Sequence, residues 1–185
     1  MILRILLCSL VILLYACSSP TPEITNSEST MKLTSPAFSE GAEIPSQYTC
    51  DGANTNPQLD IVDVPASAKS LVLIMDDPDV PAAVRPERMW DHWVGFNMPP
   101  ATASVPAGQN PPGAMGRNSG GKLTYGGPCP PPQFEPARHR YFFKLFALDT
   151  MLDLKEGASK AEVIAAMKDH IIATATLMGT YQRKK

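Results

Sequence analysis

The sequence carries little net charge, few cysteines and none of several common catalytic motifs. Its 16 lysines and arginines against 18 aspartates and glutamates leave a formal net charge of −2 over 185 residues. No basic stripe gathers the positive residues, so nucleic acid is not an expected partner. The motifs HExxH, GxSxG and CxxC do not occur. The metalloprotease, serine hydrolase and paired-cysteine zinc classes that they define are therefore not expected.

The first residues of the chain form an export pattern. A single basic residue, Arg4, precedes the apolar segment 5–15, which is too short to span a bilayer as a helix. The dipeptide Ala16-Cys17 that follows resembles the end of a bacterial lipoprotein signal, in which cleavage leaves a lipid-modified cysteine. We therefore expect a signal peptide at 1–16 and lipid on Cys17, with simple cleavage of the signal as the alternative.

The residues after this cysteine are polar and contain one isolated isoleucine. They cannot bury a core, so 17–30 is expected to be the lipidated cysteine and a disordered tether. The folded domain is expected at 31–185, a length that suits one domain with a substantial core. Because Ser18 follows the cysteine in place of an aspartate, resemblance to Gram-negative lipoproteins favours the outer membrane. The expected location is the bacterial cell envelope, with a membrane-anchored domain facing the periplasm.

The four cysteines leave one candidate disulfide. Cys8 departs with the signal and Cys17 is expected to carry lipid, so that Cys50 and Cys129 remain. In an oxidising compartment, two remaining thiols favour a disulfide between Cys50 and Cys129. Two free buried thiols are the alternative. A zinc site is disfavoured because neither cysteine has a CxxC partner.

Short apolar runs separated by Pro, Gly, Asn and Asp follow one another from residue 31 to residue 149. This spacing is typical of an all-β sandwich or barrel. The run 71–75 is apolar at every position and predicts a strand buried on both faces. It ends near Asp77, because the prolines that follow cannot donate to a β-ladder. Strands are predicted at 57–64, 70–76, 91–98 and 140–149.

One long helix is predicted near the C-terminus. Ser159 and Glu162 have the spacing of a capping box, and Gly179 can end a helix. A helical period between them places four apolar residues on one face: Ile164, Met167, Ile171 and Ala175. We expect this helix to pack beside the sandwich, with His170 on it as a structural or surface residue.

Two acidic residues, Asp77 and Asp79, follow the predicted strand 70–76 on a turn that Pro78 and Pro81 stiffen. Carboxylates in such a place are either exposed or paired. An ordinary solvated turn is the alternative to a functional one, since Asp and Pro are common turn residues.

Two histidines and a tyrosine occur in strand patterns further along the chain. A period of two places His92 on the same face as Val94 and Phe96, and places His139 on the same side of the sheet as Tyr141. Taken alone, each histidine is more often a structural residue than a ligand-binding one. Between these strands, the glycines of the loop 125–132 let backbone N–H groups approach a ligand, while its prolines keep it rigid.

In chain order, these motifs resemble the phosphatidylethanolamine-binding proteins, closest to the bacterial and archaeal branch often called Raf kinase inhibitor-like. The resemblance rests on Asp77-Pro78-Asp79-x-Pro81, Trp90-x-His92, Gly127-Pro128-x-Pro130 and His139-Arg140-Tyr141, and it extends over nearly all of 31–183. It implies a mostly β fold, a sandwich of two antiparallel sheets with Greek-key connections and peripheral helices, one of them near the C-terminus. It also implies a small pocket at one end, where family members accept phosphate, acetate or a phospholipid head group.

The resemblance assigns the ligand site to nine residues: Asp77, Asp79, Pro81, Trp90, His92, Gly127, Pro128, His139 and Tyr141. The histidines and Tyr141 can donate to a phosphate oxygen, and Gly127 can present its backbone N–H. A carboxylate repels an anion, so Asp77 needs another role. We hypothesise that it orients a histidine and favours the doubly protonated imidazolium that binds anions, and that it can accept from an ethanolamine ammonium.

The expected function is that of an envelope-tethered binding protein without a cofactor. Its pocket is expected to hold a small anion or phosphorylated head group, and its surface to inhibit a protein partner such as a protease. One alternative is a metal-dependent phosphoester hydrolase, because two aspartates and two histidines could bind a divalent metal and activate water. A second alternative is a structural envelope domain in which Asp77, His92 and His139 saturate one another with hydrogen bonds.

Overall fold

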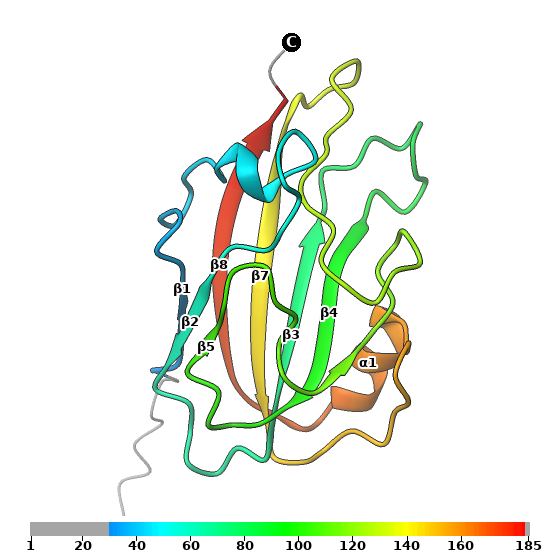
Figure 1. Ribbon diagram of the computed structural model, residues 1–185. Coiled ribbons are helices and arrows are strands. Elements are labelled where there is room, and N and C mark those ends of the chain that lie inside the picture. The colour runs from blue at the N-terminus through cyan, green and yellow to red at the C-terminus, as the bar shows by residue number, and fades with distance from the viewer. Residues whose placement is uncertain (1–29, 184–185) are drawn as a thin grey trace, which may run out of the picture.

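The protein is described by a computed structural model that covers residues 30–183. The predicted signal peptide, Cys17 and the tether up to residue 29 lie outside these residues. The described chain forms two antiparallel sheets, one in front of the other (Figure 1). The smaller sheet has the strand order β1-β2-β5, formed by Lys32–Thr34, Leu59–Val62 and Ser104–Val105. The mostly β sandwich that the sequence predicts is therefore confirmed.

The larger sheet has five strands in the order β6-β4-β3-β7-β8. In chain order these are β3 Ser70–Asp77, β4 Trp90–Met98, β6 Ala114–Met115, β7 Arg138–Leu148 and β8 Ile171–Gln182. The four predicted strands correspond to β2, β3, β4 and β7. The short strands β1, β5 and β6 and the long strand β8 were not predicted.

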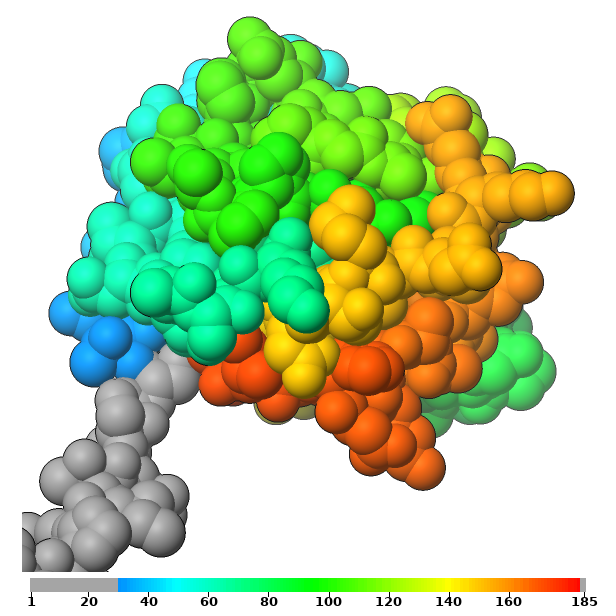
Figure 2. Space-filling model, turned by 90° about the horizontal axis from the view of Figure 1, so that it is seen from below, coloured from blue at the N-terminus to red at the C-terminus, as the bar shows by residue number. Residues whose placement is uncertain are grey.

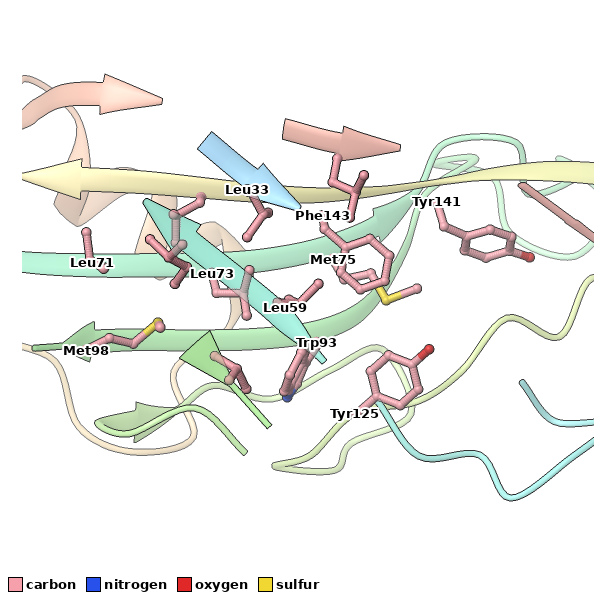
Figure 3. Close-up of a cluster of buried hydrophobic side chains, with 14 of the residues drawn as sticks. Leu33, Leu59, Leu71, Leu73, Met75, Trp93, Met98, Tyr125, Tyr141 and Phe143 are labelled. Atoms are coloured by element: carbon pink, nitrogen blue, oxygen red, sulfur yellow. The ribbon is translucent and has the colours of Figure 1, made fainter. Parts of the chain in front are cut away.

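The central strand β3 is buried along its whole length. Leu71, Leu73 and Met75 face the space between the two sheets, where they pack against residues of β1, β2, β4 and β7 (Figure 3). Val72 and Ile74 face the other way, into a second apolar cluster beneath the helix. Burial on both faces is why every position of this run is apolar.

The helix is shorter than predicted. α1, Lys160–Met167, begins with the predicted capping box, in which Ser159 N–H donates to Glu162 Oε2 (2.7 Å) and Glu162 N–H donates to Ser159 Oγ (3.3 Å). It ends at Met167, and the chain turns through Asp169 at φ +67°. The prediction of a helix continuing to Gly179 is wrong. No helix among residues 30–183 is long and apolar enough to cross a membrane.

Strand β8 occupies the segment predicted as the second half of the helix, and it pairs with β7 along its length. Its buried residues Leu177, Gly179 and Tyr181 alternate with more exposed ones, which is the period of a strand. Two residues predicted for the buried helix face are exposed instead, Ile164 at 45% and Ile171 at 42%.

The two ends of the sandwich differ. Figure 2 shows the end at which the turns before β3 and after β7 gather, coloured green-blue and orange. At the other end, β3 stops, β4 and β7 begin, and the long loops come together above them (Figure 1). The candidate functional residues lie at this second end.

Candidate functional site

A pocket of about 380 Å³ opens where β3, β4 and β7 meet the loops. Five of the nine predicted site residues line it: Asp77, Trp90, His92, Gly127 and His139. The strand order explains this convergence, because β3 lies between β4 and β7 and all three have an end here. Residues distant in sequence therefore line the same pocket.

The floor of the pocket contains a paired carboxylate and imidazole. His139 on β7 lies 2.7 Å from Asp77 Oδ2 at the end of β3, measured from its Nδ1. Both are buried, with His139 1% and Asp77 3% exposed. The other oxygen of Asp77 accepts the backbone N–H of Asp79 (2.8 Å) and so shapes the turn. This contact places Asp77 where it can orient the His139 ring.

His92 reaches the pocket through a β-bulge. The pairing of β3 with β4 passes from Met75↔Trp93 to Asp76↔Asp91, which leaves His92 as an extra residue. Its ring packs edge-on against Tyr141 at 5.3 Å, on the face that looks between the sheets. Val94 and Phe96 lie on the opposite face, so the prediction that His92 shares their face is wrong. The bulge redirects the side chain.

A loop carbonyl holds the His92 ring. His92 Nδ1 lies 2.6 Å from the carbonyl oxygen of Gly126, and Gly126 N–H donates to the His92 carbonyl (2.9 Å). Burial lowers the pKa of His92, although the Gly126 carbonyl and the charge of Asp77 oppose that shift. The neutral ring is therefore favoured at neutral pH, with its proton on Nδ1.

Tyr141 lies between the two histidines without lining the pocket itself. Its ring stacks on His139 at 6.4 Å, and Figure 3 shows it at one end of the core cluster. Burial raises the pKa of Tyr141, and the nearby charge of Asp77 adds to the shift. Its hydroxyl therefore keeps its proton and can donate it to a hydrogen bond.

The loop 125–132, which borders the pocket, is bonded to the segment around the short 3₁₀ turn η1, Ser46–Tyr48. Cys50 and Cys129 form a disulfide with Cα atoms 5.4 Å apart, which confirms the predicted pairing. Cys50 N–H also donates to the Pro128 carbonyl (3.1 Å). The loop is thus held by covalent and hydrogen bonds together.

Gly127 lines the pocket for a reason other than the predicted one. Its N–H donates to Asn54 Oδ1 (2.7 Å), so this donor is already used. A Cβ at Gly127 would collide with backbone atoms of Tyr48 and Thr49. Close approach of two loops therefore requires glycine here.

Besides Tyr141, three predicted residues do not line the pocket: Asp79, Pro81 and Pro128. Asp79 points to Arg140, accepting from its Nε (2.8 Å), Nη2 (2.7 Å) and backbone N–H (2.9 Å). This bidentate pairing holds the pKa of Asp79 below its usual value. The acidic turn thus sends one carboxylate inward and one outward.

Sequence reasoning missed several residues of the pocket wall: Asn54, Val80, Val84, Asn118, Lys122, Pro130 and Pro131. Only the Asp-Pro-rich turn, which contains Val80, and the rigid Pro-rich loop gave any signal for them. Lys122 matters most among these residues, because it brings a positive charge to the rim. Within residues 30–183, no group of three or more His, Cys, Asp or Glu side chains is placed to hold a metal ion.

Two antiparallel sheets with a small pocket at one end define a β-sandwich protein, and comparison with known proteins identifies its family. The sequence profile of the phosphatidylethanolamine-binding proteins matches residues 34–182. The chain belongs to this family.

Individual relatives agree with this assignment. The UPF0098 protein of Chlamydia trachomatis is 46% identical over 153 residues, which cover 83% of this chain and 99% of that protein. A crystal structure of a phosphatidylethanolamine-binding protein homologue from C. trachomatis matches with a TM-score of 0.80 and 45% identity, covering 85% of this chain and all of that one. Escherichia coli YBCL, described as a member of the mammalian family, matches with a TM-score of 0.74 and 30% identity, covering 83% and 99% of the two chains.

Proposed function

We propose that this chain binds a small anion, in particular a phosphorylated group, in the pocket at the end of the sandwich. One observation carries the proposal. His92 Nε2, His139 Nε2 and the Tyr141 hydroxyl are buried and have no hydrogen-bond partner among residues 30–183. Buried polar groups are almost always paired. Both histidines line the pocket, so a bound ligand whose oxygens reach their Nε2 atoms would pair them.

The charges near the pocket are compatible with an anion. The Asp77 carboxylate lies against His139, so an imidazolium there would neutralise it. The second carboxylate of the acidic turn, that of Asp79, pairs with Arg140. Lys122, which lines the pocket, adds a positive charge to its rim. The objection that the acidic turn repels anions therefore applies to one paired carboxylate only.

The two alternative functions fit the described residues less well. A purely structural cluster would need Asp77, His92 and His139 to saturate one another, yet both Nε2 atoms lack partners among the described residues. A metal-dependent hydrolase of the kind considered above would use both aspartates, and Asp79 is engaged with Arg140. Binding is therefore the function that this geometry supports best.

The test is a calorimetric titration of the purified chain with inorganic phosphate and with phosphorylethanolamine. We expect saturable binding that weakens at least about tenfold in His139→Ala, because that substitution removes both a ligand donor and the partner of Asp77. His170→Ala is the matched control, since His170 pairs with Asp149 at an exposed site away from the pocket. Absence of binding to either probe by the wild-type chain would reject the proposal.

We also propose that a lipid on Cys17 holds the domain at the bacterial envelope, in the outer membrane and facing the periplasm. The support is the Ala16-Cys17 pattern after a short apolar segment, together with a disulfide that suits an oxidising compartment. Mass spectrometry of the mature chain should find acyl groups on Cys17, and Cys17→Ser should move the protein from the membrane fraction. Inhibition of a protein partner such as a protease stays a prediction.

A further inference from the structure

The end of the sandwich opposite the pocket exposes large apolar side chains. Strands β3 and β8 begin at this end, and β4 and β7 finish there. Seven large apolar side chains are exposed among residues 30–183, and four of them lie at this end. They are Val62 at 48%, Met151 at 55%, Ile171 at 42% and Ile172 at 38%. Single exposed apolar residues are common, but several at one end of a molecule indicate a contact surface.

Two turns at the same end add further apolar surface. The turn 63–69 connects β2 to β3, and the turn 99–103 connects β4 to β5. Eight of their twelve residues are Val, Pro or Ala. Their only charged residues, Asp63 and Lys69, have opposite signs. We call the two turns and the four exposed apolar residues the base, and Figure 2 looks onto this end of the molecule.

The chain enters the domain at the base. Lys32, the first residue of β1, pairs with the exposed Val62 at the end of β2. Residues 18–29 separate Cys17 from the first described residue, and twelve residues span at most about 40 Å when fully extended. The pocket lies at the other end of β7, whose eleven residues span about 35 Å. A lipid on Cys17 would therefore hold the base closer to the bilayer than the pocket.

We propose that the base rests on the phospholipid bilayer that carries the lipid of Cys17, so that the pocket opens away from this bilayer. The exposed apolar side chains enter the boundary between head groups and acyl chains. Four side chains and two small turns bind weakly by themselves. The lipid makes the contact intramolecular, so that a weak affinity suffices. This inference rests on the lipid anchor proposed above, and it does not depend on what the pocket binds.

Tryptophan fluorescence tests which end of the domain meets the bilayer. The mature lipidated protein is placed in vesicles that contain lipids brominated near their head groups, because bromine quenches tryptophan on contact. Val62→Trp and Val84→Trp are a matched pair, since the two valines are 48% and 47% exposed and Val84 lines the pocket. After subtraction of the wild-type signal, we expect the tryptophan at position 62 to lose about half of its fluorescence and that at position 84 to lose none.

A second variant separates apolar contact from mere proximity to the tether. Ile171→Asp with Ile172→Asp places two charges in the base, and in the Val62→Trp background it should abolish the quenching. The protein should stay in the membrane fraction, because its lipid is unchanged. Hydrogen exchange gives a measurement without substitutions in the base. Amides of the turn 63–69 should exchange more slowly in the vesicle-bound wild type than in soluble Cys17→Ser.

The outcomes separate this inference from the anchor on which it rests. If mass spectrometry finds no acyl group on Cys17, the anchor is rejected and the contact of the base with it. If the acyl group is present but neither position is quenched, the anchor holds and this inference is wrong. Quenching at position 84 alone would place the pocket end on the bilayer and overturn it. Quenching at position 62 that persists with both aspartates would also contradict it.

Discussion

Asp77 and Asp79 are two residues apart and have opposite surroundings. Asp77 is buried against His139, whereas Asp79 pairs with an Arg140 side chain that is 53% exposed. The same acidic motif therefore supplies one pocket residue and one surface ion pair. Two residues of β4 that are also two positions apart have different surroundings. The bulge turns His92 towards the pocket, whereas Val94 packs beneath the helix.

Substitution of Asp79 should show a stability effect that depends on pH. Hydrogen bonds from Arg140 hold the pKa of Asp79 below its usual value of 3.8. The ionised carboxylate therefore stabilises the fold at pH values above 3.8, and this contribution is lost as pH falls through the lowered folded-state pKa. In urea unfolding, Asp79→Asn should lower the free energy of unfolding by about 1 kcal/mol at pH 7.

The difference between the variant and the wild type should shrink as pH falls below 3.8 and through the lowered folded-state pKa, because the wild-type carboxyl then becomes protonated as well. Asp153→Asn is a suitable control, since Asp153 is exposed and makes no ion pair within the described residues. An equal difference at pH 7 and at low pH would mean that geometry, and not charge, is what the substitution removes.

The sequence motifs predicted which segments meet at the pocket, but not the orientation of every side chain. Asp77, Trp90, His92, Gly127 and His139 do converge there. Nothing in the spacing of Asp77 and Asp79 says which carboxylate will meet a histidine and which an arginine. That choice depends on β7 lying beside β3, which is a property of the sheet and not of the turn.

At the scale of elements, Asp76 joins β3, β7 and α1. Its buried carboxylate lies 2.9 Å from the ammonium of Lys144 on β7 and 3.2 Å from that of Lys160 at the start of α1. Lys160 also pairs with Asp91 on β4. The helix is thus held to the sheet by charge as well as by its apolar face.

Replacing Asp76 with alanine should destabilise this junction strongly. Lys160 is only 13% exposed, so the substitution leaves a largely buried ammonium with less compensation. We expect a loss of about 3 kcal/mol in the free energy of unfolding, measured in urea. The triple variant Asp76→Leu, Lys160→Met and Asp91→Asn removes the Lys160 charge together with both carboxylates that pair with it, and should recover a large part of that loss. If it recovers none, packing and not charge explains the effect.

The elements differ in how well the sequence predicts them. The strand β3 is predicted almost to the residue, because burial on both faces leaves an apolar run with no other explanation. The segment that contains Ile171 and Ala175 fits a helical face and a strand equally in its apolar spacing. The turn at Asp169 and the pairing of β8 with β7 decide between them, and both depend on contacts distant in sequence.

For the whole molecule, we expect the disulfide to contribute more to stability than either Asp76 or Asp79 does. It joins residues 79 positions apart, and closing a loop of that length in the unfolded chain is worth about 4–5 kcal/mol in the chain-entropy model. The double variant Cys50→Ser with Cys129→Ser should lose a comparable amount in urea unfolding. It should also weaken anion binding, because both cysteines line the pocket. Unchanged stability would show that the hydrogen bonds between the two loops suffice.

The same bond makes a closed covalent ring of residues 50–129, and this ring includes β2, β3, β4, β5 and β6. A protease that cuts the exposed segment around Ala82 and Ala83 would therefore open the ring without releasing a fragment. The nicked protein should migrate as one species in a denaturing gel without reductant and as two species with it. A single cleavage on this side of the pocket therefore leaves the two parts of the chain joined by the disulfide.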